Sequence, residues 1–227
     1  MIKASIIIPT LNEESRIQSA LESLQRLRQH NIEIIVSDGG SGDETVAFCT
    51  PLVDITVNSL KGRARQMNGA AWQASGELLI FLHADTQLPE NILSIVDELI
   101  TKKTLWGFFR VRLSGQSILL RMVEGFMNWR SQTWGTGTGD QTLFIRREMF
   151  LRAGGFEDIP LMEDIAFCAQ CKLFARPYIV EQCVVTSSRR WEEFGVWRTI
   201  WLMWRLRFAY FRGASPQQLA QQYYSGN

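Results

Sequence analysis

The chain has 227 residues, of which 46% are hydrophobic and 21% charged, and its formal net charge is +1. This length and composition allow one large buried core, and the near-neutral charge gives no indication of nucleic-acid binding. No stretch offers the ~20 uncharged apolar residues of a membrane span, and we recognise no signal peptide. We therefore expect a cytoplasmic protein with one large domain, alone or with an appendage.

The chain contains four cysteines, at positions 49, 168, 171 and 183. Cys168 and Cys171 have the spacing of half a zinc site, but they fall in a predicted helix and no second pair completes the site. Buried free thiols in a reducing cytosol are therefore the expected state.

Predicted strands alternate with predicted helices from residue 4 to about residue 102. The strands cover 5–8, 32–36, 53–57 and 78–82, and the helices end near residues 28, 50, 74 and 101. This alternation predicts right-handed crossovers and a doubly wound, mostly parallel α/β sheet. The segment 78–82 is an unbroken apolar run, as expected of a central strand buried on both faces.

The pattern becomes less regular after residue 102. We expect further strands over 106–113 and 141–145, a strand or hairpin over 178–186, and helices over 117–134, 146–153 and 163–173. One long helix rich in aromatic residues and arginine is expected over 193–212, with a final short helix after it.

Polar side chains follow three of the early strands, at Pro9-Thr10-Leu11-Asn12-Glu13, at Ser37-Asp38 and at His83-Ala84-Asp85. The carboxyl ends of parallel strands meet at one edge of the sheet, where such sheets bind ligands. Asp85 could hold a hard cation that recruits phosphate oxygens, or it could be a turn aspartate. A later acid pair, Glu163-Asp164, follows Gly154-Gly155-Phe156.

These motifs, in this order, resemble those of family 2 glycosyltransferases with the GT-A fold, over nearly the whole chain. The resemblance includes Ile6–Glu13, Ser37–Ser41 with Asp43-Glu44-Thr45, Gly62–Asn68, the triplet that ends at Asp85, Gly154–Phe156 and Glu163-Asp164. It implies an inverting transfer of a sugar from a nucleotide diphosphate sugar, typically UDP-linked, to an acceptor hydroxyl. It further implies a GT-A catalytic domain over 1–190, with a nucleotide-binding half (1–102) and an acceptor-side half (103–190), and a C-terminal helical extension over 191–227.

The resemblance also implies roles for single residues. Pro9, Thr10 and Glu13 would line the nucleoside pocket, Asp38 would accept a hydrogen bond from the base, and Arg65 would lie near the nucleotide. Asp85 would bind a divalent metal, Mn²⁺ or Mg²⁺, that bridges the diphosphate. Asp164 would be the general base that removes the proton from the acceptor hydroxyl.

Two positions depart from the family pattern. His83 stands where the family usually has aspartate, and it could bind Mn²⁺ or hydrogen-bond the ribose or phosphate. Arg190-Trp191 matches only the end of the Gln-x-x-Arg-Trp motif of cellulose-synthase-like members. Arg190 could reach the diphosphate and Trp191 could stack on the acceptor, or this stretch could be a surface pair of arginines with a packing Trp.

Three further polar residues have two interpretations each. Asp140 and Gln141 could contact the acceptor or donor sugar, or they could belong to a plain turn. Glu163 could orient Asp164 or face solvent, and adjacent like charges tend to raise the pKa of one of them.

Other functions fit the motifs less well. A sugar-phosphate nucleotidyltransferase needs a glycine-rich basic loop after the first strand, and a dinucleotide dehydrogenase needs Gly-x-Gly-x-x-Gly there. A non-catalytic nucleotide-sugar-binding module would be expected to lose some of the three aspartates, yet Asp38, Asp85 and Asp164 are all present.

The segment 193–212 has an apolar stripe beside a basic one. The apolar stripe contains Trp197, Trp201, Trp204, Phe208 and Phe211, and the basic one contains Arg198, Arg205 and Arg212. This pattern is typical of a helix in the plane of a membrane interface, which would suit a lipid-linked acceptor at the cytoplasmic face. The alternative is that the stripe packs on the catalytic domain or on a second copy in a homodimer.

Overall fold

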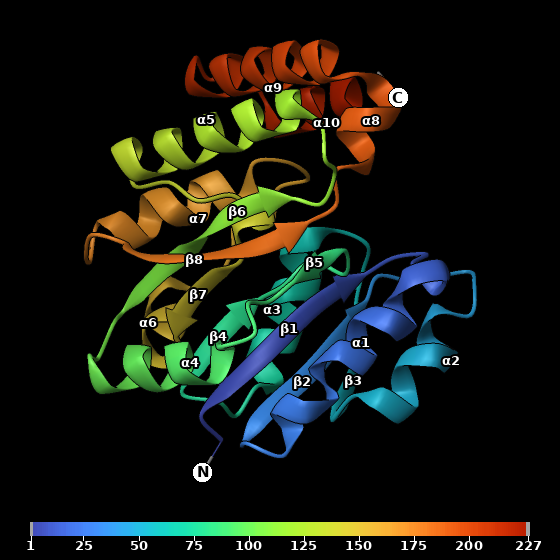
Figure 1. Cartoon of the computed structure of the whole chain (residues 1–227), viewed down its shortest axis with the longest axis vertical. Coiled ribbons are helices and arrows are strands. Elements are labelled where there is room, and N and C mark those ends of the chain that lie inside the picture. The colour runs from blue at the N-terminus through green and yellow to red at the C-terminus, as the bar shows by residue number, and fades with distance from the viewer. Residues whose placement is uncertain (1, 226–227) are drawn as a thin grey trace.

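The computed structural model describes residues 2–225 of the chain and shows an α/β fold (Figure 1). The first half contains β1 (Ala4–Thr10), α1 (Glu14–Arg28), β2 (Ile32–Asp38), α2 (Thr45–Cys49), the 3₁₀ turn η1 (Thr50–Leu52), β3 (Ile55–Asn58), α3 (Arg63–Gln73), β4 (Leu78–Phe81), β5 (Thr86–Gln87) and α4 (Ile92–Thr101). The second half contains β6 (Trp106–Leu113), α5 (Ile118–Trp134), the 3₁₀ turn η2 (Gly139–Gln141), β7 (Leu143–Arg146), α6 (Arg147–Ala153), α7 (Glu163–Lys172), β8 (Tyr178–Thr186), α8 (Arg189–Phe194), α9 (Val196–Phe211) and α10 (Pro216–Ser225).

The strands that the structure describes form one sheet in the order β3-β2-β1-β4-β7-β6-β8-β5. The first four of these are parallel, as the alternation of strands and helices predicted. β7 then runs antiparallel to both β4 and β6, so the sheet is mixed in its second half. The predicted α/β fold is confirmed, and the parallel arrangement holds for the half that carries the three polar strand ends.

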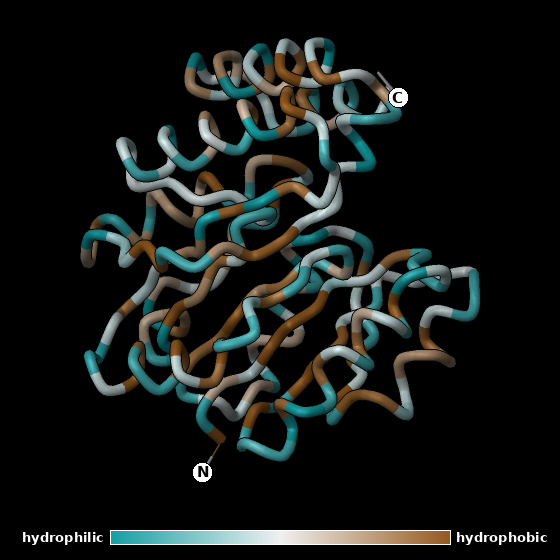
Figure 2. Tube along the Cα trace, in the orientation of Figure 1, coloured by the Kyte–Doolittle hydropathy of each residue, from teal (hydrophilic) through white to brown (hydrophobic). Residues whose placement is uncertain are grey.

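The central strands are buried on both faces, which explains their unbroken apolar sequences. In β1, Ile6 and Ile8 face one hydrophobic cluster and Ile7 faces another, because successive side chains of a strand point to opposite faces. α1, α4 and α5 contribute side chains to the first cluster, and α3, α6 and α7 to the second. Figure 2 shows this hydrophobic centre as the brown stretches that follow the strands.

The long helix predicted over 193–212 is confirmed as α9 for most of its length, but it begins at Val196, three residues later than predicted. Gly195 has a φ of +81°, which an L-residue with a side chain rarely adopts, and the chain turns there between α8 and α9. No helix within residues 2–225 combines the length and apolar character needed to cross a bilayer.

The C-terminal helices pack against the part of the chain that leads into α7. Leu206 of α9 and Leu219 of α10 lie in one buried cluster with Leu161, Met162 and Ile165. Figure 1 shows α9 beside α5, on the side of the molecule away from β1 to β3, and α10 packs against α9. This packing connects the C-terminal segment to the start of α7, where Glu163 and Asp164 lie.

Candidate active site

The side chain of Asp38 is buried at the sheet edge formed by the carboxyl ends of β2, β1 and β4. It accepts hydrogen bonds from the backbone N–H groups of Gly40 and Ser41, each at 2.8 Å. It also accepts one from Thr10 Oγ1 at 3.3 Å, next to the partly buried Pro9. Asp38 therefore holds the turn after β2 against the end of β1, and a bound base would meet a carboxylate already fixed in place.

Glu13 lies among charged groups at the same edge. Burial raises the pKa of its carboxyl, and the negative charge of Asp85 raises it further, whereas Arg16, Arg189 and Arg63 act in the opposite direction. These effects place Glu13 and Asp85 in one neighbourhood with arginines from two distant segments. Such a mixture of carboxylates and guanidinium groups suits a polyanionic ligand with a metal ion.

Arg65 does not join this neighbourhood. Its Nε donates a hydrogen bond to Oδ1 of Asp158 at 2.8 Å, and the pair lies at the surface. Arg63 and Arg65 are two positions apart in α3, which turns by ~100° per residue, so they point to opposite sides of the helix. The arginine that α3 presents to the acids is therefore Arg63, and the structure does not bring Arg65 to the other predicted nucleotide-binding residues.

His83 and Asp140 face each other, with Nδ1 of His83 at 3.5 Å from Oδ1 of Asp140. Burial acts to raise the pKa of Asp140, but the hydrogen bond and charge of His83, together with Arg63 and Arg130, lower it overall. On the opposite edge of the imidazole, a Cβ added at Gly139 would come within 2.4 Å of Nε2 and Cε1. Asp140 and the close backbone of Gly139 therefore fix the orientation of the imidazole ring.

Asp164 lies in the first turn of α7 and is held by two backbone groups. The N–H of Gly139 donates to its Oδ2 at 3.0 Å, and the N–H of Ile165 donates to its Oδ1 at 2.7 Å. The turn η2 therefore brings the predicted base close to Asp140 and His83. Each oxygen of the carboxylate retains a lone pair that could accept a proton.

Glu163 is buried and does not face solvent. Burial raises the pKa of its carboxyl, the charge of Asp164 raises it further, and Arg63 and His83 partly offset both effects. Glu163 is therefore a buried carboxyl whose pKa is raised, and the adjacent Asp164 is held by the loop at Gly139.

Gln141 has a structural role in the conformation that the structure shows. Its Oε1 accepts hydrogen bonds from Ser131 Oγ at 2.6 Å and from the backbone N–H of Thr138 at 3.3 Å. Its Nε2 donates to the carbonyl of Phe109 at 3.4 Å. These bonds attach the loop before β7 to α5 and β6, so Gln141 supports Asp140 and is not itself turned toward a ligand.

Arg190 and Trp191 are both occupied by packing. The guanidinium of Arg190 lies over the ring of Tyr223, 4.0 Å from its centroid, and over that of Phe194 at 5.7 Å. Trp191 packs against the main hydrophobic cluster. Both side chains thus have a packing role in this structure. The arginine of this segment that lies close to Glu13 is the preceding one, Arg189.

Four arginines near the acids were missed in the sequence. Arg63 directly follows Gly62 at the start of α3, so its helical position could have identified it. Arg189 could have been weighed together with Arg190. Arg130 and Arg207 come from α5 and α9, and no local motif marks either of them.

A divalent metal would find a carboxylate at this edge but no cage formed by the protein alone. Among residues 2–225, no three His, Cys, Asp or Glu side chains gather as metal ligands. Asp85 is partly buried, and its Oδ1 accepts one long hydrogen bond, from Thr86 Oγ1 at 3.4 Å. Metals at phosphate sites are often held by one or two carboxylates and by the phosphates themselves, so Asp85 fits this role. His83 fits it less well, because Nδ1 faces Asp140 and Gly139 crowds Nε2.

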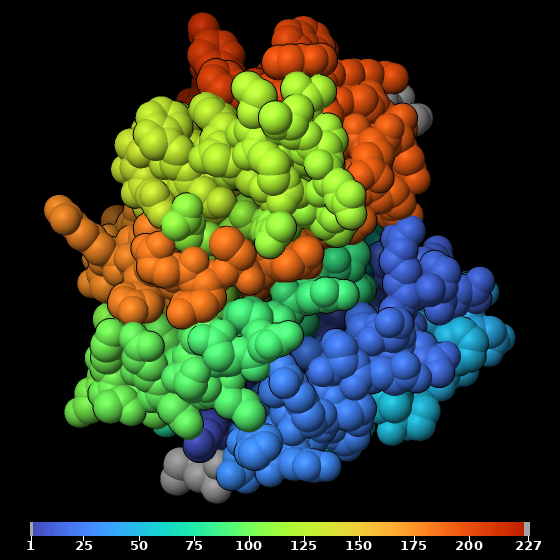
Figure 3. All heavy atoms as spheres, in the orientation of Figure 1, coloured from blue at the N-terminus to red at the C-terminus, as the bar shows by residue number. Residues whose placement is uncertain are grey.

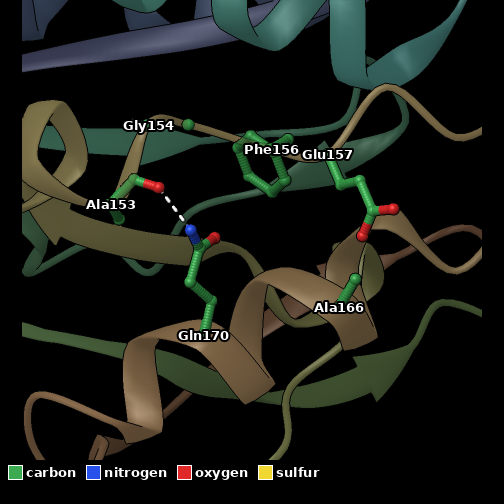
Figure 4. Close-up of a pocket in the computed structure, with 7 residues that line it drawn as sticks. Ala153, Gly154, Phe156, Glu157, Ala166 and Gln170 are labelled. Atoms are coloured by element: carbon green, nitrogen blue, oxygen red, sulfur yellow. Dashed lines mark hydrogen bonds between the residues drawn. The ribbon is translucent and has the colours of Figure 1, made fainter.

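A cavity of about 280 Å³ lies elsewhere, between the end of α6 and the outer side of α7. Figure 4 shows the side chain of Gln170 donating a hydrogen bond to the carbonyl of Ala153 in its wall. None of the predicted site residues lines this cavity. The acids at the sheet edge, and not this cavity, therefore define the candidate site.

The outer faces of α5 and α9 expose large hydrophobic side chains. We call this the α5–α9 apolar surface, and it consists of Ile118, Met122, Trp129, Trp134, Trp197, Trp201, Trp204, Phe208 and Phe211. The rings of Phe126 and Trp204 stack at 5.4 Å where the two helices meet, and Figure 3 shows α5, in yellow-green, at the surface of the molecule. The interpretation that the stripe of α9 packs on the catalytic domain is wrong, since Trp197 is 69% and Phe211 72% exposed.

Comparison with solved structures shows the same fold in several glycosyltransferases. S. aureus TarS in complex with UDP-GlcNAc matches with a TM-score of 0.67 at 20% identity, over 82% of this chain and 58% of that one. Glucosyl-3-phosphoglycerate synthase from Mycobacterium tuberculosis, in complex with Mn²⁺, UDP and glucosyl-3-phosphoglycerate, matches with a TM-score of 0.59 at 18% identity, over 81% and 70%. The GT-A fold expected from the sequence is thereby confirmed.

Sequence relatives give the family. An uncharacterized glycosyltransferase of Mycobacterium tuberculosis is 30% identical over 195 residues, which cover 80% of this chain and 72% of the relative. A GalNAc(5)-diNAcBac-PP-undecaprenol beta-1,3-glucosyltransferase of Campylobacter jejuni is 33% identical over 41% of this chain and 33% of its own length. The model of glycosyl transferase family 2 matches residues 5–154. The chain is a glycosyltransferase and belongs to glycosyl transferase family 2.

Proposed function

We propose that this enzyme transfers a sugar from a UDP-sugar to an acceptor hydroxyl with inversion at the anomeric carbon. The observation that carries the proposal is the position of Asp164, whose carboxylate is held by the N–H of Gly139 next to the His83–Asp140 pair. An inverting transfer needs one base on the acceptor side and positive charge at the leaving diphosphate. Asp164 would supply the first, and Arg63 and Arg189, with a metal ion held by Asp85, would supply the second.

In this mechanism the acceptor hydroxyl gives its proton to Asp164 while its oxygen forms a bond to the anomeric carbon. The bond from that carbon to the diphosphate breaks, and the electron pair leaves with UDP. Arg63 and Arg189, which interact with Glu13, would stabilise the charge that develops on the diphosphate. Asp140 and Gly139 fix the orientation of the His83 imidazole beside the proposed base.

A divalent metal fits Asp85, and it would add charge neutralisation at the leaving group. Two fold neighbours support metal use by similar proteins, since a mannosyltransferase of Pyrobaculum calidifontis is described with GDP-Man and Mn²⁺, and the synthase of M. tuberculosis with Mn²⁺ and UDP. One of these two neighbours is described with a guanosine nucleotide and the other with a uridine nucleotide, so the fold does not determine the base. A uridine base in the donor of this enzyme is therefore part of our proposal.

The alternative activities lose support. Family membership disfavours a sugar-phosphate nucleotidyltransferase, and the order in the acid cluster disfavours a decayed binding module. A panel of nucleotide sugars tests the proposal directly. We expect a UDP-sugar to raise the melting temperature by mass action, more with Mn²⁺ than with chelator, and to release UDP faster when a membrane extract supplies acceptor. Stabilisation by a GDP-sugar alone would contradict the assignment of a UDP-sugar as donor. A rate of UDP release that is the same with and without acceptor would contradict sugar transfer.

We further propose that the α5–α9 apolar surface contacts the cytoplasmic face of a membrane and that the acceptor is lipid-linked. Arg205 lies over the ring of Trp201 and Arg212 over that of Phe208, at 4.8 and 5.5 Å, so cationic groups border the exposed aromatic rings. This combination is typical of helices that lie on anionic lipid surfaces. The name of the C. jejuni relative, which specifies an undecaprenol-linked substrate, supports the proposal.

A further inference from the structure

Arg130 and Arg207 lie close together although they come from helices far apart in the sequence. The contact between Phe126 and Trp204 brings α5 and α9 side by side, and Arg130 and Arg207 follow these rings by four and three positions, about one turn later. The two guanidinium groups repel one another and are near Asp164 and Asp140. This places two positive charges beside the proposed base.

One buried nitrogen of this arginine pair has no hydrogen-bond partner among the described residues. Nη2 of Arg130 is buried without a hydrogen-bond partner, and within residues 2–225 neither arginine forms an ion pair. The carboxylate of Asp164 accepts hydrogen bonds from backbone N–H groups, and that of Asp140 faces His83. Neither acid therefore forms an ion pair with Arg130 or Arg207. Buried charged donors are normally hydrogen-bonded, so Nη2 of Arg130 is available to an anionic ligand.

The electrostatics of the pair fit the same conclusion. Burial lowers the pKa of Arg130 to about 10, and the charge of Arg207 lowers it further, while Asp164 and Asp140 act in the opposite direction. Burial also lowers the pKa of Arg207. Arginine side chains are positively charged at neutral pH, so the repulsion between Arg130 and Arg207 is present in the ligand-free protein. A bound dianion would replace this repulsion with attraction to both guanidinium groups.

The acids on the two sides of the site have partly different arginine partners. Arg63 and Arg189 interact with Glu13, and Glu13 with Asp85, at the edge formed by β1 and β4. Arg63 also interacts with Asp140 and Glu163, so it lies between the two groups of acids. Arg130 and Arg207 interact with Asp164 and Asp140, and Arg207 also with Cys168 on α7. This second arginine pair therefore lies on the side of the proposed base.

We propose that Arg130 and Arg207 form an oxyanion subsite for a phosphate group of the acceptor, which positions the acceptor hydroxyl at Asp164. This inference rests on the proposed function, because it assumes that Asp164 is the base. Two guanidinium groups match the charge of a phosphate dianion and can each donate two parallel hydrogen bonds to its oxygens. A carboxylate would neutralise only one of the two charges.

The test is a calorimetric titration of the full chain with inorganic phosphate, carried out with the donor site saturated by UDP and Mg²⁺. We expect phosphate to bind this complex, and Arg130→Gln or Arg207→Gln to weaken it by about tenfold or more, the scale of one lost charge-assisted hydrogen bond. Arg205→Gln is the matched control, since Arg205 lies on the same helix but is exposed. It should change the phosphate affinity by less than about twofold.

Several results would overturn the inference. These are a UDP complex that does not bind phosphate, variants at 130 and 207 that bind it normally, or an Arg205→Gln variant that loses as much affinity. UDP affinity is measured in each variant, so failure to bind UDP would contradict the proposed function and would be distinguished from failure of the subsite. Binding of glycerol phosphate assigns a soluble phosphomonoester, and arginine-dependent binding of dihexanoyl phosphatidic acid alone assigns a lipid phosphate.

Discussion

The backbone N–H of Gly139 donates a hydrogen bond to Oδ2 of Asp164 at 3.0 Å, across 25 positions of sequence. A Cβ at position 139 would collide with the imidazole of His83, so glycine at this position lets one segment contact both side chains. The loop before β7 therefore sets the distance between the acid at the start of α7 and the histidine at the end of β4.

Replacing Asp164 by Asn should separate binding from chemistry. Asp164→Asn keeps the shape of the side chain but removes the proton acceptor, so transfer should fall by ~10²-fold or more while UDP-sugar affinity stays near that of the wild type. Single-turnover assays and calorimetry measure the two effects. Glu163→Gln is the matched control at the neighbouring acid. Turnover that survives in Asp164→Asn but is lost in Glu163→Gln would assign the base to Glu163.

Replacing Asp85 by Ala should remove the metal-dependent part of nucleotide binding. We expect UDP to bind Asp85→Ala equally well with Mn²⁺ and with chelator, because the carboxylate that holds the metal is gone. His83→Gln provides the comparison, and it should keep a metal effect if His83 orients the ligand without binding the metal. If Mn²⁺ still enhanced UDP binding by Asp85→Ala, another ligand would have to be sought.

The buried carboxyl of Glu163 should make stability depend on pH. Its pKa in the folded protein is raised by burial and by Asp164, above the ordinary value of 4.5. The folded state therefore holds this proton more tightly than the unfolded state, and the contribution of Glu163 to stability falls as pH rises from 4.5 through the raised pKa. Glu163→Gln lacks this loss, so its melting temperature relative to wild type should be higher at about pH 7 than at about pH 4. A difference that is constant with pH, or that runs the other way, would mean that Glu163 is ionised without cost.

The α5–α9 apolar surface should bind anionic vesicles. We expect the protein to sediment with vesicles that contain phosphatidylglycerol, less so at high salt because screening weakens the attraction of the arginines. The double substitution Trp201→Ala and Trp204→Ala should abolish sedimentation, whereas Trp72→Ala, which removes an exposed aromatic residue of α3, should not. Folded protein that stays in the supernatant at low salt, and that forms a dimer disrupted by the same double substitution, would assign the surface to a second copy of the chain.

Much of the fold could be predicted because local sequence determines it. The strand over 106–113, the strand over 178–186 and the helix that ends at Trp134 have the predicted limits, since apolar periodicity and glycine mark them. The antiparallel position of β7 was not predictable, because it depends on pairing between distant strands. The break at Gly195 was missed because the aromatic periodicity continues on both sides of it.

The site could be predicted in part for the same reason. Strand ends located Asp38 and Asp85 at one edge, since parallel strands bring their carboxyl ends together. The sequence could not show which of Arg63 and Arg65 faces the acids, because that depends on how α3 is rotated about its axis. Nor could it show the role of Gln141, which depends on its hydrogen-bond partners on α5 and β6. The pair formed by Arg130 and Arg207 exists only through the packing of α5 on α9, so no spacing in the sequence indicates it.

The cluster in which Leu206 and Leu219 pack on Leu161, Met162 and Ile165 crosses the predicted domain boundary at residue 190. A protein shortened at that boundary would leave three apolar side chains in water just where α7 begins. It would keep the parallel half of the sheet and the nucleotide-binding residues, yet the start of α7 would lose the packing that holds Asp164 in place. The C-terminal helices therefore hold the start of α7 in position. A molecule that binds to their outer face and shifts them would also change the position of Asp164.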